Sequence, residues 1–288
     1  MTTLYLKSMS KVILITGASS GIGLATAKLF LDKGYIVLAA TGEPKKAQAL
    51  EIYANALHKR NLLHVYELDV NSDASVQKTI EKIAETFLSI DILVNNAGFG
   101  FAGAVEDFAI DEAKAQFETN FFGVHRMIKA VLPIMRTQKS GTIVNISSMG
   151  GKVTFPFFAM YNASKHALES YTEGLWMELT QIGIRVYMVE PGLIETNFYS
   201  SHMKFPLNYE KSQSVYKFLY EKYVGSSDKM AGSGRSDPSV VARKIFQVVE
   251  SNSSTLRHPV GKYAGLILWA RWILPDWIFL PIIAKIRG

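Results

Sequence analysis

The sequence predicts an α/β fold, namely a single doubly wound domain in which helices cover both faces of a mostly parallel seven-stranded sheet. The first observation is that apolar runs of strand length alternate with segments of helical periodicity. The second is that these runs are rich in valine, isoleucine and leucine without strict alternation, which is typical of parallel strands covered on both faces. The third is length, because 288 residues with 48% hydrophobic content can form one large core.

Each element is expected at a definite stretch of the chain. Strands are expected at residues 11–16, 35–40, 62–68, 91–95, 142–147 and 184–190, with a seventh at an edge near 255–258, and helices at 21–33, 44–60, 72–88, 111–138 and 160–182. Residues 1–10 are then an N-terminal extension, residues 11–260 the domain, and residues 261–288 a hydrophobic tail. Residues 197–237 form a long insertion, which predicts a helical lid over a substrate.

Composition excludes several classes of function. The chain has no cysteine, which excludes disulfides, thiolate catalysis and cysteine-ligated metal centres. Its six histidines have no ligand spacing, so no metal site is expected. The net charge of +6 is dispersed and not interleaved with aromatic residues, so no nucleic-acid partner is expected. The N-terminal apolar run is too short for a signal peptide, and a cytoplasmic location is expected.

Chemically suggestive segments follow the predicted strands one after another. The first six strands are followed by TGASSGIG at residues 16–23, Thr41–Gly42, Asp69–Val70, NNAG at residues 95–98, SSMGG at residues 147–151 and EPG at residues 190–192. Open parallel sheets bind their ligands outside the carboxyl ends of the strands. The pattern therefore predicts one functional cleft at that edge of the sheet.

The first of these segments is a glycine-rich turn between a strand and a helix. Gly17, Gly21 and Gly23 have the spacing GxxxGxG. Glycines allow a tight turn and a close approach of the backbone to a ligand, and a helix N-terminus offers unpaired N–H groups to a phosphate. The turn therefore predicts a site for the pyrophosphate of a dinucleotide.

The end of the second strand bears on which dinucleotide is bound. An acidic residue at this place would accept hydrogen bonds from a ribose 2′-hydroxyl, whereas neutral or basic residues admit a 2′-phosphate. Thr41 stands here, no carboxylate comes before Glu43, and Lys45 and Lys46 follow. NADP(H) is therefore the preferred cofactor, with NAD(H) as the alternative. Under that alternative, the two lysines are only the solvated first turn of a helix.

Tyr161 and Lys165 stand four residues apart in YNASK, so they project from one face of a helix. A cation beside a phenol favours the phenolate and lowers a pKa that is ordinarily about 10. The pair therefore predicts a proton donor and acceptor near neutral pH, as hydride transfer to or from a carbonyl carbon requires. The alternative is a tyrosine and a lysine on the surface of an amphipathic helix.

Together these segments resemble the short-chain dehydrogenase/reductase family, whose domain is of the Rossmann type. The resemblance covers residues 11–200. Its motifs are TGxxxGxG at Thr16–Gly23, NNAG at Asn95–Gly98, the asparagine Asn120 in FETNFFG, the serine Ser148 thirteen residues before the tyrosine, YxxxK at Tyr161–Lys165, and Pro191-Gly192 followed by Thr196. The chain departs from the pattern after the second strand, where it has neither aspartate nor arginine, and this leaves the choice of cofactor open.

The resemblance implies roles for individual residues. Tyr161 would be the acid/base, Ser148 would orient the substrate oxygen, Lys165 would hold the nicotinamide ribose and lower the tyrosine pKa, and Asn120 would hold a relay water. The implied cofactor-binding residues are Gly17, Ser19, Ser20, Gly21, Ile22, Gly23, Thr41, Asp69 and Val70 (adenine), Asn95, Ala97 and Gly98 (ribose), Tyr161, Lys165, and Pro191, Gly192 and Thr196 (nicotinamide end). Family members commonly form homodimers or homotetramers, here through helices 111–138 and 160–182.

Aromatic residues suggest the substrate. The predicted lid is rich in tyrosine and phenylalanine, and Phe99, Phe101, Met149, Phe155, Phe157 and Phe158 stand near the catalytic residues in sequence. Such walls suit a lipophilic ketone or aldehyde and its alcohol, of the steroid, retinoid or long-chain kind, and the chain resembles the hydroxysteroid and retinol dehydrogenase branch. The alternatives are that these aromatics only pack the insertion, that the enzyme is a 3-oxoacyl reductase of lipid metabolism, or that the chain is a non-catalytic, nucleotide-responsive binding protein.

The tail at residues 263–286 is apolar but interrupted by Arg271, Asp276 and two prolines, so it offers no uncharged stretch of the roughly 20 residues that span a bilayer. Two interpretations stay open. The tail lies peripherally in a membrane interface, as its three tryptophans suggest, or it is an arm that covers the cleft or a partner subunit.

Overall fold

The computed structural model describes residues 10–196, 198, 202–211, 214–223, 234–251 and 253–285. Its centre is a seven-stranded sheet with the order β3-β2-β1-β4-β6-β7-β9, and every neighbouring pair is parallel. The strands are β1 (Val12–Thr16), β2 (Ile36–Thr41), β3 (Leu63–Glu67), β4 (Ile92–Asn95), β6 (Gly141–Ile146), β7 (Ile184–Pro191) and β9 (Arg257–Val260). The predicted doubly wound sheet is confirmed, and its seventh strand is the expected edge strand.

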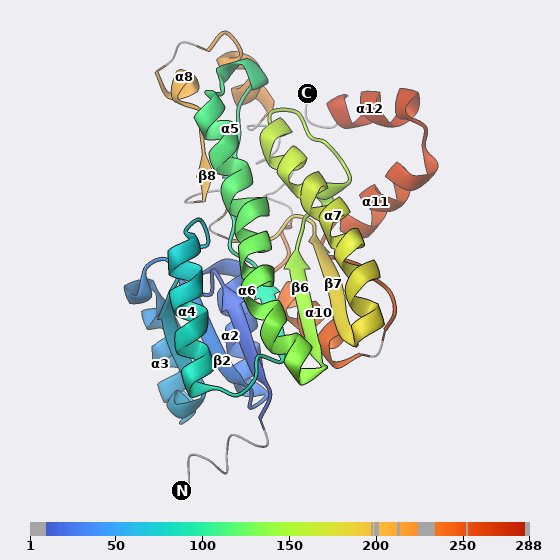
Figure 1. Cartoon of the computed structure of the whole chain (residues 1–288). Coiled ribbons are helices and arrows are strands. Elements are labelled where there is room, and N and C mark those ends of the chain that lie inside the picture. Colours follow the sequence, from blue (N-terminus) through green and yellow to red (C-terminus); the bar gives the residue numbers. More distant parts are fainter. Residues whose placement is uncertain are drawn as a thin grey trace, which may run out of the picture.

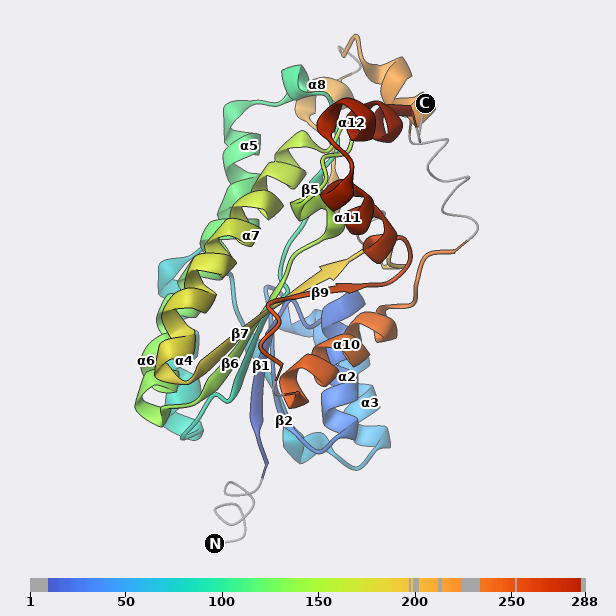
Figure 2. The same cartoon turned by 90° about the vertical axis from the view of Figure 1, so that its right-hand side faces the viewer.

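Helices cover both faces of the sheet (Figure 2). One face carries α2 (Gly21–Asp32), α3 (Gln48–Ala56) and α10 (Pro238–Glu250), and the other carries α4 (Asp73–Thr86), α6 (Gly123–Gln138) and α7 (Ala159–Leu179). Adjacent residues of β1 show how the core divides, because Leu14 packs with the second group of helices and Ile15 with the first. A central strand thus has no polar face, which explains its continuous apolar sequence.

Two predicted helices are interrupted. The segment 44–60 is a 3-10 turn η1 (Pro44–Ala47) followed by α3, which ends before His58 because that residue has a left-handed φ of 55°; the 3-10 turn η2 (Arg60–Leu62) follows. The segment 111–138 is α5 (Ile110–Phe117), a π-helical turn η4 (Glu118–Phe122) and α6. Short 3-10 turns also occur as η3 (Val105–Asp107), η5 (Met149–Gly151) and η6 (Thr180–Ile182).

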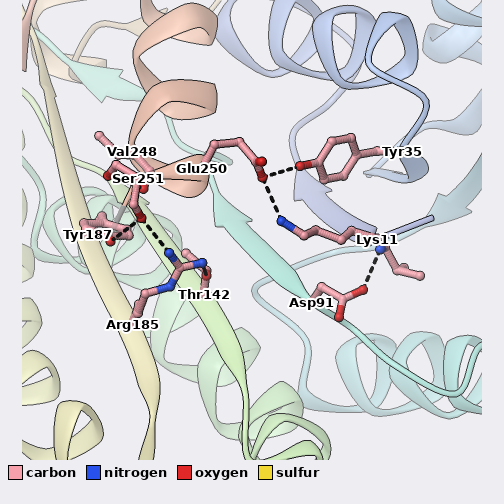
Figure 3. Close-up of polar contacts among 10 residues, drawn as sticks. Lys11, Tyr35, Asp91, Thr142, Arg185, Tyr187, Val248, Glu250 and Ser251 are labelled. Carbon is pink, nitrogen blue, oxygen red and sulfur yellow. Dashed lines mark hydrogen bonds and ion pairs between the residues drawn. The ribbon is translucent and has the colours of Figure 1, made fainter. Parts of the chain in front are cut away.

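Polar contacts connect the elements at the amino ends of the strands (Figure 3). Glu250, at the end of α10, accepts hydrogen bonds from Tyr35 and from Lys11 Nζ, the latter at 2.8 Å. Arg185 donates to the Ser251 carbonyl at 2.7 Å and to Thr142 Oγ1 at 2.8 Å. The bonds of Arg185 join β6, β7 and the end of α10 at the amino ends of the strands. The loops that carry the predicted motifs lie at the opposite, carboxyl ends.

The predicted lid is anchored above the carboxyl edge. Its described residues include β8 (Met203–Lys204), which pairs in parallel with β5 (Gly100–Phe101), and α8 (Leu207–Glu210). Ser214 Oγ donates a 2.6 Å hydrogen bond to Asp107 Oδ2 and fixes the lid from a second side. The rest of the predicted insertion, residues 197, 199–201, 212–213 and 224–233, lies outside the described residues, as do residues 1–9 of the extension.

The tail consists of two helices, α11 (Ala264–Ile273) and α12 (Asp276–Lys285), beside α7 and above β9 (Figures 1 and 2). Phe279 and Ile283 of α12 are buried against Val153, which lies in the loop after β6. Among the helices of the described ranges, none has both the length and the apolarity needed to cross a membrane.

Candidate active site

A cleft of about 400 Å³ lies at the carboxyl edge of the sheet. It is lined by the loops that follow β1, β2, β4, β6 and β7, by the first turns of α7, and by two described residues of the lid region. Of the predicted site residues, it brings together Gly17, Ser19, Ser20, Gly21, Ile22, Thr41, Ala97, Gly98, Ser148, Tyr161, Lys165, Pro191, Gly192 and Thr196. Five predicted residues do not line it, namely Gly23, Asp69, Val70, Asn95 and Asn120.

The glycine-rich turn is shaped by close backbone contacts. Gly17 has a left-handed φ of 66°, and a β-carbon on Gly23 would lie 2.2 Å from the Gly17 carbonyl oxygen. Gly23 therefore permits the close packing of the turn and lies behind the cleft wall. At the front, α2 begins at Gly21 with no acidic residue in its first turn and no side-chain hydrogen bond from Ser20 to its N–H groups. This cradle fits a dinucleotide pyrophosphate.

Asn96, to which the sequence analysis assigned no role, joins the first and fourth loops. Its amide donates to the carbonyl oxygens of Thr16 at 2.9 Å and Gly17 at 3.1 Å. In return, Thr16 Oγ1 accepts the backbone N–H groups of Asn96 and Ala97, each at 3.0 Å. Asn96 is the second asparagine of NNAG, and its proximity to the glycine turn depends on the parallel pairing of β1 with β4.

The first asparagine, Asn95, is directed elsewhere. Its side chain is buried in the sheet and donates to Asn145 Oδ1 at 2.9 Å. Asp69 lies at the surface, where its carboxylate accepts the Asn71 N–H at 2.9 Å, and Val70 packs beneath Gly123. The ribose and adenine contacts implied for these residues stay predictions.

The loop after β2 brings polar groups to the same end of the cleft. Thr41 Oγ1 donates to Ser19 Oγ at 3.2 Å, which connects this loop to the glycine turn. Lys46 lines the cleft beside Glu43 and forms a 2.6 Å ion pair with it, and both side chains are exposed. A cation at this place can meet a phosphate on the adenosine ribose, while its own carboxylate partner competes for it.

Ser148 and Tyr161 border one glycine. Ser148 Oγ accepts the Gly150 N–H at 3.0 Å, and a β-carbon on Gly150 would lie 3.4 Å from both Ser148 Oγ and Tyr161 Cε1. The Tyr161 ring also meets the Phe198 ring, with centroids 5.5 Å apart. A hydroxyl and a phenol thus face one region of the cleft, where both can contact a single substrate oxygen.

Lys165 is buried on the same face of α7, one turn after Tyr161. Its Nζ donates to the Ile146 carbonyl at 2.8 Å. Burial lowers the pKa of Lys165 from 10.5 to about 8, against the opposing charge of Glu169. The ammonium is therefore still the main form at neutral pH.

Asn120 lies behind this group, in the π-helical turn η4. Its amide donates to the Phe99 carbonyl at 2.9 Å and to Ser164 Oγ at 3.2 Å, and its Oδ1 accepts the Phe99 N–H at 3.2 Å. Ser164 in turn donates to the Tyr161 carbonyl at 2.7 Å. Asn120 is thus coupled to the tyrosine through the backbone, and the relay water stays a prediction.

Part of the cleft wall is apolar. It is formed by Phe99, Met149, Phe155, Phe158 and Phe198, with His202 beside them. Two aromatics predicted for this wall lie outside it: Phe101 packs against Phe99 and Phe108, and Phe157 packs against Tyr220 and Tyr223 of the lid. These two side chains hold the lid instead of lining the cleft.

A buried charged cluster that was not predicted from the sequence joins α7, β7 and β9. Arg257 Nε is 3.0 Å from Glu169 Oε2 and 3.7 Å from Glu190 Oε1, and both carboxylates are buried. Burial, and then the charge of Glu169, raise the pKa of Glu190 to about 7. One member could have been found from the sequence, because Glu169 stands one helical turn after Lys165 on α7, whereas Arg257 comes from the distant β9.

Comparison with known proteins finds relatives that cover most of the chain. A sequence model described as short chain dehydrogenase matches residues 11–205. Human retinol dehydrogenase 8 is 37% identical over 266 residues, which cover 89% of this chain and 83% of the relative. The 3-ketodihydrosphingosine reductase of Bacteroides thetaiotaomicron is 35% identical over 269 residues, covering 92% and 94%.

Solved structures share the fold together with bound cofactors. ElxO with NADP bound has a TM-score of 0.72 and 27% identity, covering 88% of this chain and 97% of its own. The 3-ketoacyl-(acyl-carrier-protein) reductase of Brucella melitensis, in complex with NADH, has a TM-score of 0.72 and 26% identity, covering 88% and 98%.

Proposed function

Since the chain belongs to the short chain dehydrogenase family, and is therefore an oxidoreductase that uses a nicotinamide cofactor, we propose that it interconverts a lipophilic ketone or aldehyde and its alcohol. The observation that supports this most is the composition of a single cleft. The glycine turn, the side chains of Tyr161, Ser148 and Lys165, and several aromatic side chains all line it.

The cofactor would be held by the residues that fit it. Backbone N–H groups at the start of α2 would bind its pyrophosphate, and Thr196, whose methyl group lies 3.2 Å from the β-carbon position of Gly21, would flank the same turn. Pro191 and Gly192 would border the nicotinamide end. When bound, the nicotinamide supplies or accepts the hydride.

The chain's own residues supply the proton and the orientation. In the reductive direction, Tyr161 would donate its phenolic proton to the carbonyl oxygen as that oxygen gains negative charge, and Ser148 Oγ would donate a second hydrogen bond to it. Lys165, still charged at neutral pH, would stabilise the resulting phenolate. In the oxidative direction the same phenolate would take the proton from the alcohol.

The proposed substrate class rests on the apolar wall and on two relatives. Apolar clefts gain affinity by removing hydrocarbon surface from water, at about 25 cal/mol for each Å². Retinol and 3-ketodihydrosphingosine, which give the two relatives their names, both join a reacting oxygen to a long hydrocarbon. A substrate of the same kind would place its oxygen at Tyr161 and its hydrocarbon along Phe155, Phe158 and Phe198.

A second candidate is a 3-oxoacyl reductase. The Bacteroides relative and the Brucella structure are both named for 3-keto substrates, which supports reduction of a ketone near the polar end of a long chain, and the Brucella enzyme is named for an acyl chain. The two candidates share the proton chemistry and differ in what the far end of the cleft must accept.

NADP(H) is the proposed cofactor. Lys46 lines the cleft where the 2′-phosphate would lie, and no carboxylate precedes Glu43 after β2. ElxO binds NADP and supports this preference, while the NADH complex of the Brucella enzyme represents the alternative.

The test is oxidation of NADPH and of NADH, measured against a panel of steroid, retinoid, 3-oxoacyl and small polar carbonyls. Turnover of the apolar carbonyls, faster with NADPH, is the expected result. Efficient turnover confined to the small polar carbonyls would contradict the substrate class. Equal efficiency with both cofactors would contradict the cofactor preference. Turnover confined to 3-oxoacyl chains would favour the second candidate.

A further inference from the structure

The two helices of the tail are apolar on all sides but covered on one side only. On α11, buried Ala264 and half-buried Ile267, Leu268 and Ala270 face the molecule. The opposite arc of the same helix carries Leu266, Trp269, Trp272 and Ile273, all exposed. On α12, Trp277, Leu280 and Ile282 are exposed on the sides away from buried Phe279 and Ile283. Helices that are apolar all round are ordinarily buried all round.

The charged residues of the tail are arranged so that the outer face keeps its apolar character. Arg271 forms a 2.5 Å ion pair with Asp276 across the turn between the helices, and its guanidinium lies 5.3 Å from the centre of the buried Phe279 ring. The pair therefore closes the turn, and the exposed fractions of Trp272 and Trp277 reach 83% and 76%. Tryptophan is enriched where one side of a ring meets hydrocarbon and the other meets water.

The lid adds a second exposed apolar segment at the same end of the molecule. Leu207, Val215, Phe218 and Leu219 are exposed there, and both views show the lid and the tail at the end to which the strands point (Figures 1 and 2). Residues 202–223 contain four lysines and two glutamates, and α12 ends at Lys285. Lysines thus exceed glutamates within the lid, while Glu106, Asp107 and Glu112 accept hydrogen bonds from it. The chain as a whole carries a net charge of +6, which suits anionic headgroups.

From this arrangement we infer that α11 and α12 form a docking surface for the interface of a lipid bilayer that contains anionic lipids. Trp269, Trp272 and Trp277 lie among the headgroups and the aliphatic residues between them reach the acyl boundary. The inference does not rest on the proposed reaction, because it depends only on the exposure and charge of the tail and the lid. Neither helix needs to cross the bilayer.

Docking would place the cleft beside the bilayer. Val153 and Phe155 of the loop after β6 pack with the tail, and Phe155 also lines the cleft. The same loop thus joins the docking surface to the apolar wall. A hydrophobic molecule dissolved in the bilayer would have a short path to the cleft.

The test is co-sedimentation of the full chain with phosphatidylcholine vesicles, with and without phosphatidylserine. We expect binding that phosphatidylserine strengthens and salt weakens, together with a blue shift of tryptophan emission on vesicle addition. The double variant Trp272→Glu and Trp277→Glu should bind at least about tenfold more weakly, because two large apolar side chains are lost from the contact. A matched control, Ile52→Glu with Leu88→Glu, changes two exposed apolar residues on α3 and after α4 and should bind like the wild type.

Unchanged thermal unfolding would show that the tail variant is folded. Wild-type protein that sediments with neither kind of vesicle would overturn the inference, and so would a tail variant that binds as tightly as the control. The wild type could instead form a concentration-dependent oligomer and bind no vesicles, while the tail variant is monomeric. That result would assign the surface to a second copy of the chain.

Discussion

The two halves of the cleft are built in different ways. The half that fits the cofactor is made of loops directly after strands, and its shape depends on backbone contacts such as that between Gly17 and Gly23. The half proposed for the substrate is made of aromatic side chains from loops, lid and α7, such as Phe155 and Phe198. The first is fixed by the sheet, while the second is fixed by the packing of segments far apart in sequence.

Substitutions in the two halves should therefore have different effects. A change at a tightly packed glycine of the cofactor half must disturb the turn between β1 and α2, and with it the fold around the first strand. A change in the substrate half removes one side chain from a wall, and the sheet beneath should not respond. If the comparison is right, affinity for cofactor and affinity for substrate can be altered separately.

The largest effect is expected from Gly23→Ala, which breaks the cofactor half. Its β-carbon would lie 2.2 Å from the Gly17 carbonyl oxygen, and the overlap should cost about 3 kcal/mol of unfolding free energy and most of the NADPH affinity. Gly174→Ala is the matched control, since a β-carbon there meets nothing within 4 Å. In the middle of α7 it should stabilise by ~0.5–1 kcal/mol. Urea unfolding and NADPH titration measure both variants, and equal effects would refute the account of the turn.

A smaller effect is expected from Phe198→Ala, which breaks the substrate half alone. The ring packs on Tyr161 and lines the apolar wall. Its loss should raise KM for an apolar carbonyl by about tenfold, which corresponds to roughly 1.4 kcal/mol of binding free energy. The affinity for NADPH should not change. Steady-state kinetics and cofactor titration check this. A parallel loss of NADPH affinity would show that the two halves are coupled.

The buried cluster of Glu169, Glu190 and Arg257 should respond to pH. The pKa of Glu190 is raised by burial from 4.5 to about 7, so the folded state binds more protons than the unfolded state between these pH values. The free energy of unfolding that Glu190 contributes is therefore fully present below about pH 4.5 and is lost as the pH rises to about 7. Between pH 5 and pH 8, the free energy of unfolding of Glu190→Gln should increase by at least about 1 kcal/mol relative to that of the wild type. Thermal unfolding at both pH values measures this, and a constant difference would contradict the assignment.

The smallest effect is expected from Lys46→Ala, which tests whether this side chain contacts the 2′-phosphate of the cofactor. The side chain is exposed and shared with Glu43, so its contact with a phosphate is worth little more than an exposed ion pair. KM for NADPH should rise about threefold while KM for NADH stays constant. An equal change for both cofactors would mean that Lys46 does not meet the 2′-phosphate.

The sequence predicted the cofactor half better than the substrate half for a physical reason. Strand positions and the loops after them follow from local apolar runs and from glycine spacing, so the order of elements and most of the cleft's motif residues could be placed. Asn96 and Arg257 could not be assigned, because their partners depend on which strands become neighbours. Phe101 and Phe157 were expected in the wall, but pleat and lid packing turned them to other partners.

The interruptions of the helices could not be predicted from the local sequence pattern either. The π-helical turn around Asn120 is held by hydrogen bonds to Phe99, a residue twenty-one positions earlier. Similarly, the strand pair β5 and β8 arises only when the lid lies over the loop after β4. Such features are set by tertiary contacts, which periodicity does not record.

The most direct test of the account is the variant Tyr161→Phe, measured for NADPH binding and for turnover in one preparation. The substitution removes the proton donor and leaves the ring against Phe198 in place. We expect NADPH affinity within about twofold of the wild type and turnover reduced by at least about a hundredfold. Turnover within about tenfold of the wild type, or loss of NADPH binding with intact folding, would contradict the proposed role of this tyrosine.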